Sequence, residues 1–118
     1  MKTSESRKTM KNVKVYIASP YTKGDCAKNV RVQIDCWDEL TNLGFYPFAP
    51  LYSHFQHMVH PRPFEDWIRT DKVWVETCDC LLRLPGVSTG GDIEVEHARS
   101  FGKPVFYSVQ DLVNFYTF

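Results

Sequence analysis

The sequence predicts an α/β fold in which helices cover both faces of a single parallel sheet. Short apolar runs rich in β-branched residues alternate along the chain with longer segments whose apolar residues recur every three or four positions. Glycine and proline separate most of these segments, as expected for the turns between strands and helices. With 118 residues, the chain is long enough for one such domain and too short for two.

Four segments are predicted to be strands. The first, residues 13–19 (VKVYIAS), is an apolar run followed by the breakers Pro20 and Gly24. The other three are shorter and are placed at residues 45–48, 80–84 and 104–109. Their apolar character is typical of strands that are buried in a domain core.

Two longer helices are predicted before the third strand. The first has Asp25 as a suitable N-cap and Gly44 as a suitable stop. Its apolar stripe comprises Ala27, Val30, Ile34, Trp37 and Leu40. Residues 51–62 have no clear period and are predicted to form a loop, and the second helix should begin near Pro63. Its stripe comprises Phe64, Trp67, Ile68, Asp71 and Val75.

A third helix is predicted at residues 93–101, where Gly102 stops it, and Asp111 is placed to cap a short final helix. Strands that alternate with helices pair in parallel through right-handed crossovers. We therefore expect a three-layer α/β/α, flavodoxin-like (Rossmann-like) domain with a four- to five-stranded parallel sheet. Such sheets bind ligands beyond the carboxyl ends of their strands, which here are residues 19–24, 50–54 and 85–91.

The charge balance argues against large anionic partners. The chain has 14 basic and 14 acidic residues, so it has no overall attraction to a nucleic acid polymer or to a membrane surface. Residues 1–12 are polar and basic without the apolar run of a signal peptide, and we expect them to be a flexible tail before a single domain at residues 13–118. These features predict a cytoplasmic protein.

The cysteines are predicted to be free thiols. Cys26, Cys36, Cys78 and Cys80 include no CxxC pair, and three of the four lie in segments that are predicted to be buried. In a reducing compartment such cysteines pack as small hydrophobic residues, and disulfides are the less favoured alternative.

The loop at residues 86–91 (GVSTGG) is a candidate binding site. Its glycines and hydroxyls precede the third helix, where backbone N–H groups and the helix dipole favour an anion. An ordinary flexible connection is the alternative. Glu94 is expected in the first turn of that helix, where the dipole would keep it ionised and available as a nucleophile. Asp92 and Glu96 are rival acids, and a purely structural first-turn acid is also open.

Asp71 is a second candidate because it lies on the apolar stripe of its helix. A buried charge there is costly unless it has a partner or a function. The alternative is that the helix breaks near Thr70 and that Asp71 caps a second piece. Two carboxylates on neighbouring elements suit glycosidic chemistry, in which one attacks the anomeric carbon and the other handles a proton. Tyr16, expected at the end of the first strand, could orient the nucleophile or simply belong to the core.

Three histidines, His54, His57 and His60, recur at every third residue. The spacing suggests no fourth ligand, so no metal is predicted and solvated loop histidines are favoured, with His54 facing the cleft.

Several short segments, taken in order, resemble the nucleoside 2-deoxyribosyltransferase superfamily, which includes the transferases and the 2′-deoxynucleoside 5′-monophosphate N-hydrolases. The likeness is closest to short, functionally undefined relatives with a YIASPY-like start, and it covers residues 13–107. The segments are YIASP at 16–20, Asp71 with Asp79 eight residues later, Ser88-x-Gly90-x-x-x-Glu94, and Ala98 followed by GKPV at 102–105.

The resemblance implies an enzyme that cleaves or exchanges the N-glycosidic bond of a 2′-deoxyribonucleoside, or of its 5′-monophosphate, through a covalent glycosyl-Glu94 intermediate. It makes Asp71 the acid that assists the leaving base and Tyr16 the group that positions Glu94. It places Ser88 and Gly90 beside the sugar or its 5′ end. It implies no cofactor, and it implies a homodimer or a higher homo-oligomer.

The loop after the first strand departs from the hydrolases, which grip a phosphate there with arginine. Here Lys23 is its only cation and Tyr21 is a bulky insertion, while Asp92 replaces a glycine and would repel a phosphate. These departures favour a nucleoside over a monophosphate. The expected substrate-binding residues are Ser19, Pro20, Tyr21, Lys23, His54, Ser88, Gly90 and Asp92. A non-catalytic domain that binds or senses a nucleotide or nucleoside derivative is the alternative function.

Overall fold

The computed structural model describes residues 12–117, so the tail expected at residues 1–12 lies, except for Asn12, outside the described residues. Within this range four strands alternate with five α-helices and one 3₁₀ helix. The elements are β1 (Lys14–Ala18), α1 (Cys26–Asn42), β2 (Tyr46–Phe48), the 3₁₀ helix η1 (Pro50–Tyr52), α2 (Ser53–Val59), α3 (Phe64–Thr77), β3 (Cys80–Arg83), α4 (Thr89–Ser100), β4 (Val105–Phe106) and α5 (Val109–Tyr116).

The strands form one parallel sheet in the order β2-β1-β3-β4. This confirms the predicted α/β class and the number of strands. Strand β2 lies on one side of β1, and the chain then crosses over β1 so that β3 lies on the other side. The order of the strands thus reverses between β1 and β3, and their carboxyl ends flank the position where open α/β sheets bind ligands.

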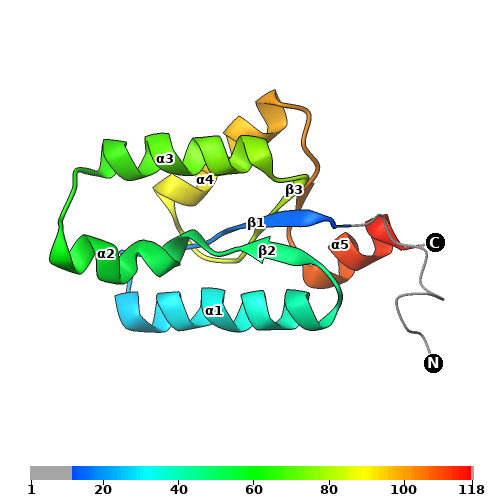
Figure 1. Cartoon of the computed structure of the whole chain (residues 1–118), viewed down its shortest axis with the longest axis horizontal. Helices are drawn as coiled ribbons and strands as arrows, with labels where there is room; N and C mark the ends of the chain where they lie inside the picture. The colour runs from blue at the N-terminus through cyan, green and yellow to red at the C-terminus, as the bar shows by residue number, and fades with distance from the viewer. Residues whose placement is uncertain (1–11, 118) are drawn as a thin grey trace.

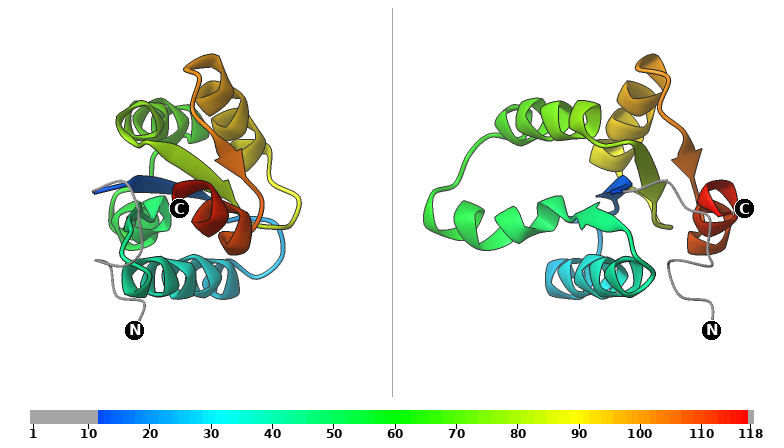
Figure 2. Two further views of the ribbon diagram at one scale, coloured as in Figure 1. Left: turned by 90° about the vertical axis from the view of Figure 1, so that its right-hand side faces the viewer. Right: turned by 45° about the vertical axis from the view of Figure 1, so that its right-hand side comes forward.

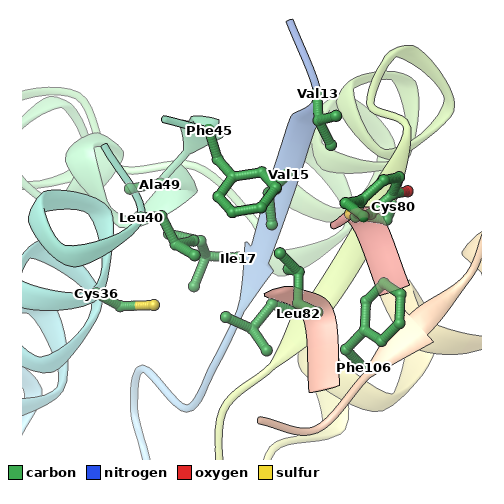
Figure 3. Close-up of a cluster of buried hydrophobic side chains, with 12 residues drawn as sticks. Val13, Val15, Ile17, Cys36, Leu40, Phe45, Ala49, Cys80, Leu82 and Phe106 are labelled. Carbon is green, nitrogen blue, oxygen red and sulfur yellow. The ribbon is translucent and has the colours of Figure 1, made fainter. Parts of the chain in front are cut away.

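Helices cover both faces of the sheet (Figure 1). Helices α3 and α4 lie on one side, whereas α1 and α5 lie on the other, and the turned views show the same three layers (Figure 2). Successive residues of β1 point to opposite faces. Val15 and Ile17 join a cluster with side chains from α1 and α5 (Figure 3), whereas Tyr16 and Ala18 join a second cluster with α3 and α4.

Helix α1 has the predicted N-cap, because the Asp25 carboxylate accepts a hydrogen bond from the Lys28 backbone N–H at 3.2 Å. Its predicted stripe is partly wrong. Ile34 is 40% exposed, whereas Gln33 is fully buried. A glutamine can occupy that position because all of its buried polar atoms have hydrogen-bond partners, as described below. The buried residues of α1 are Val30, Gln33, Cys36 and Leu40.

The loop predicted at residues 51–62 is instead largely helical, with η1 followed by α2. Phe55, Met58 and Val59 are each more than half exposed. Because these apolar residues do not face the core, the segment lacks the periodicity by which a helix is recognised in a sequence.

Two predicted helix starts differ from the structure, whereas α3 begins next to Pro63, as predicted. Helix α4 begins at Thr89 rather than at 93, because Ser88 is its N-cap and accepts a hydrogen bond from the Gly91 N–H at 2.9 Å. Ser108, not Asp111, caps α5, with its hydroxyl accepting from the Asp111 N–H at 3.1 Å.

The thiols are free, as predicted. Cys36, Cys78 and Cys80 are buried and Cys26 is half-buried. Over residues 12–117, every helix is too short or too polar to cross a membrane.

Candidate active site

A cavity of about 290 Å³ opens at the carboxyl ends of β1 and β3. This volume is close to the lower end of the range of about 300–1,000 Å³ that is typical of small-molecule sites. Its walls come from the loop after β1, from α2 and α3, and from the start of α4. Seven of the predicted site residues line it: Ser19, Tyr21, Lys23, Asp71, Ser88, Gly90 and Glu94.

Glu94 lies at the base of the cavity and is only 5% exposed. It is the sixth residue of α4, not a first-turn residue, because the helix begins at Thr89. The expectation that the helix dipole keeps Glu94 ionised is therefore wrong. Burial raises the pKa of Glu94 well above its usual value, and the negative charge of Asp71 raises it further, whereas the Arg83 guanidinium acts in the opposite direction.

Asp71 faces Glu94 from α3. This helix is continuous from Phe64 to Thr77, so the alternative in which it breaks near Thr70 is wrong. Burial raises the pKa of Asp71 to about 6, and the nearby polar groups of Glu94 and Tyr16 limit the rise. Because two adjacent carboxylates resist joint ionisation, a charge on either one favours a proton on the other.

Tyr16 lies behind this pair, on the core side. It is the third residue of β1 rather than its end, it is fully buried, and it does not line the cavity. Its hydroxyl forms no hydrogen bond of standard geometry within the described residues. Burial raises the pKa of Tyr16 well above its usual value, and the neighbouring charges of Glu94 and Asp71 add to this effect. The phenol therefore stays protonated and can donate to either carboxylate.

The glycine-rich loop is built around Arg83, which sequence reasoning missed. This buried arginine at the end of β3 donates to the carbonyl oxygens of Leu84 and Gly86, and to the Asp92 carboxylate at 3.1 Å. A Cβ on Gly91 would lie 2.9 Å from Arg83 Nε, so a side chain there would displace the guanidinium. The sequence does offer one indication of this role, because Arg83 is a charged residue at the end of an otherwise apolar strand. Asp92 itself lies outside the cavity, paired with Arg83.

Gln33 is a second missed residue of the site. Its amide N–H group donates to Ser19 Oγ at 2.8 Å and to the Ile17 carbonyl at 3.2 Å, and its amide oxygen accepts from the Leu51 N–H at 2.8 Å. It therefore ties the end of β1 to η1. Pro20 does not line the cavity but packs under the opposite loop. A Cβ on Gly86, whose φ is +115°, would lie 2.7 Å from Pro20 Cγ.

The histidines of α2 have separate partners. His54 does not line the cavity, and its Nδ1 lies 2.6 Å from the Tyr21 hydroxyl. His57 lines the cavity instead, and its Nδ1 accepts hydrogen bonds from the Trp67 indole N–H and the Arg62 backbone N–H. Within residues 12–117, no three His, Cys, Asp or Glu side chains are grouped so that they could hold a metal ion. His57 was missed because its segment was predicted to be a loop.

Comparisons with known proteins place this geometry in context. The profile of the family described as Domain of unknown function (DUF7768) matches residues 13–108. No protein of curated function matches the sequence. Among solved structures, a 2-deoxyribosyltransferase from Bacillus psychrosaccharolyticus is similar, with a TM-score of 0.58 and 22% sequence identity over 79% of this chain and 69% of that chain. At this identity, the likeness establishes a shared fold.

Proposed function

Because this chain belongs to the DUF7768 family, whose description assigns no activity, we propose one from the geometry of the cavity. The chain cleaves or exchanges the N-glycosidic bond of a 2′-deoxyribonucleoside or its 5′-monophosphate, through a covalent intermediate on Glu94. The similar structure gives independent support at the level of the fold, because its own protein is a 2-deoxyribosyltransferase.

The observation that carries the proposal is the pairing of half-buried Asp71 with buried Glu94 in the wall of the cavity. The two carboxyls come from different helices and meet at the cavity, and the pKa of each is raised by burial. Burying a carboxyl group destabilises a fold unless the group is well paired. Two carboxyls that are kept in the wall of a cavity therefore suggest a chemical role. Closely spaced carboxyls are what a double-displacement reaction at an anomeric carbon requires.

In the first step, Asp71 carries the proton and acts as the acid, while Glu94 is ionised and acts as the nucleophile. A Glu94 carboxylate oxygen then forms a bond to C1′ of the sugar as the bond from C1′ to the base nitrogen breaks. The electron pair of that bond goes to the base, and the base takes the proton from Asp71. The Tyr16 phenol lies against the pair and can hold the Glu94 oxygen that does not attack.

In the second step, water or a second base attacks C1′ from the side that the first base has left. The Asp71 carboxylate accepts the proton of this acceptor, and the bond from C1′ to Glu94 breaks. The pair returns to its state with one proton. Two displacements at the same carbon retain the configuration of the sugar.

Whether the cavity prefers a 5′-phosphate or a free 5′-hydroxyl depends on the cations around it. Lys23 lies in its wall, and Arg62, which sequence reasoning did not select, also lines it. Asp92, expected to repel a phosphate, is outside the cavity and is paired with Arg83. The structure therefore weakens the sequence argument against a monophosphate, and the test must include both kinds of substrate.

The test is to incubate the protein with deoxynucleosides and their 5′-monophosphates, alone and with a second free base, and to measure released base by chromatography. Release or exchange that is absent in Glu94→Ala is the expected result. If no substrate is cleaved although nucleosides bind in calorimetry, the chain is a binding or sensing domain.

A further inference from the structure

The His57 ring is held at a defined edge of the cavity. Its Nδ1 accepts hydrogen bonds from Trp67 Nε1 at 2.9 Å and from the Arg62 backbone nitrogen at 3.3 Å. The rings of His57 and Trp67 also meet edge to face, with centroids 5.6 Å apart at 70°. The imidazole is thus fixed by α3 and by the chain that leads into it.

These contacts determine where the neutral imidazole carries its proton. An indole N–H and a backbone N–H can only donate, so Nδ1 must be the acceptor and the proton must be on Nε2. His54 shows the contrast, because its Nδ1 partner is the Tyr21 hydroxyl, which can donate or accept. His57 is therefore a cavity-lining group that offers a hydrogen-bond donor and offers no acceptor.

The leaving base should lie near this donor. Under the proposed function, Asp71 protonates the base, so the base must contact the side of α3 that carries Asp71. Ile68, Trp67 and Phe64 precede Asp71 by three, four and seven residues, lie on the same stripe and line the cavity. They form an apolar and aromatic wall for a planar ring, and His57 packs at the Trp67 end of it.

We propose that His57 selects nucleobases that carry an oxo group over those that carry an amino group at the same ring position, an inference that rests on the proposed function. The Nε2–H of His57 donates to an exocyclic carbonyl oxygen. An amino group would instead place a second donor against it in a partly desolvated site, and neither donor would be satisfied.

The test uses matched pairs of substrates, deoxyinosine with deoxyadenosine and deoxyuridine with deoxycytidine. Within each pair, an exocyclic oxygen is replaced by an amino group, and the adjacent ring N–H becomes an unprotonated nitrogen. We expect kcat/KM to favour the oxo member by about 10- to 100-fold, as is typical when a buried donor is left unpaired by the wrong substrate.

Three variants make the test specific to the donor. His57→Phe keeps a planar ring but has no N–H, so the preference should fall to within about threefold of unity, which is the scatter expected of mutational effects. His57→Gln should restore much of the preference, because its amide oxygen can accept from Trp67 while its N–H group donates. His60→Phe is the matched control, since His60 is exposed and does not line the cavity, and it should leave the preference unchanged.

Calorimetric titration of the four nucleosides separates this inference from the proposed function, and circular dichroism verifies that each variant is folded. Oxo-selective binding that His57→Phe removes, without any cleavage, supports the inference and contradicts the proposed function. Cleavage without an oxo preference, or a preference that His57→Phe leaves intact, overturns the inference alone. If none of the four is bound or cleaved, both are overturned.

Discussion

Two neighbouring residues of β1 show how differently the two faces of the sheet are used. Ile17 and Tyr16 are both fully buried. Ile17 points to the face covered by α1 and α5, where it packs in a cluster of apolar side chains and small thiols. Tyr16 points to the face covered by α3 and α4, where the cluster is smaller and adjoins the carboxyls of Asp71 and Glu94.

The difference shows where stability and chemistry reside in this fold. The α1 and α5 face buries apolar side chains, with thiols and a phenol but no carboxyl group in its cluster. Burial of apolar area is the main favourable contribution to folding. The α3 and α4 face contains two acids whose raised pKa values show that burial opposes their charged forms. Such local violations of core packing are expected at functional sites.

The largest effect should come from Glu94→Ala. Because Asp71, the other acid in the cavity wall, serves as the proton donor, loss of the Glu94 nucleophile should lower base release by about 10⁴-fold or more. Circular dichroism should show a retained fold, because the change removes a poorly solvated acid. Turnover at the wild-type rate would move the role to another acid or exclude a covalent mechanism.

Asp71→Asn should lower turnover by about 10²–10⁴-fold and should affect binding much less. Asparagine keeps the shape of the side chain but cannot supply a proton to the departing base. Single-turnover base release with a poor and with an activated leaving group measures this role, because an activated base needs less protonation. Equal losses with both leaving groups would mean that Asp71 only positions the substrate.

Ile17→Ala tests the opposite face. Truncating this buried side chain should lower the free energy of unfolding by about 2–5 kcal/mol, as urea denaturation would measure. The rate per folded molecule should stay close to that of the wild type, since Ile17 points away from the carboxyl pair. A loss of turnover in fully folded Ile17→Ala would show that the two faces are not separate.

A smaller effect should appear in the dependence of stability on pH. Burial raises the pKa of Asp71 to about 6, so the folded chain holds a proton that the unfolded chain has lost above about pH 4. Its stabilising contribution is complete at low pH and is lost as the pH rises through about 6, with a slope of at most about 1.4 kcal/mol per pH unit. The difference in unfolding free energy between wild type and Asp71→Asn should show this fall between pH 4 and 7. A flat difference would contradict the assigned burial.

The same sequence feature predicted the sheet and selected Asp71 as a candidate site residue. Apolar runs and stripes identify what is buried, and Asp71 was conspicuous as an acid on such a stripe. The same reasoning missed Gln33 and Arg83, because each looks like a surface residue until its buried hydrogen bonds are seen. It also missed His57, whose position depends on a contact with Trp67 in the next helix. Pairings across elements leave no periodic signal in a sequence.

Covalent attachment of Glu94 to the sugar would distinguish this mechanism from others, and mass spectrometry can detect it. The protein would be quenched in acid during turnover of a deoxynucleoside with an activated leaving group and then digested. We expect a deoxyribosyl adduct on the peptide that contains Glu94, more abundant when the second acceptor is omitted and absent in Glu94→Ala. An adduct on another residue, or rapid base release without any adduct under conditions that trap it, would exclude Glu94 as the nucleophile.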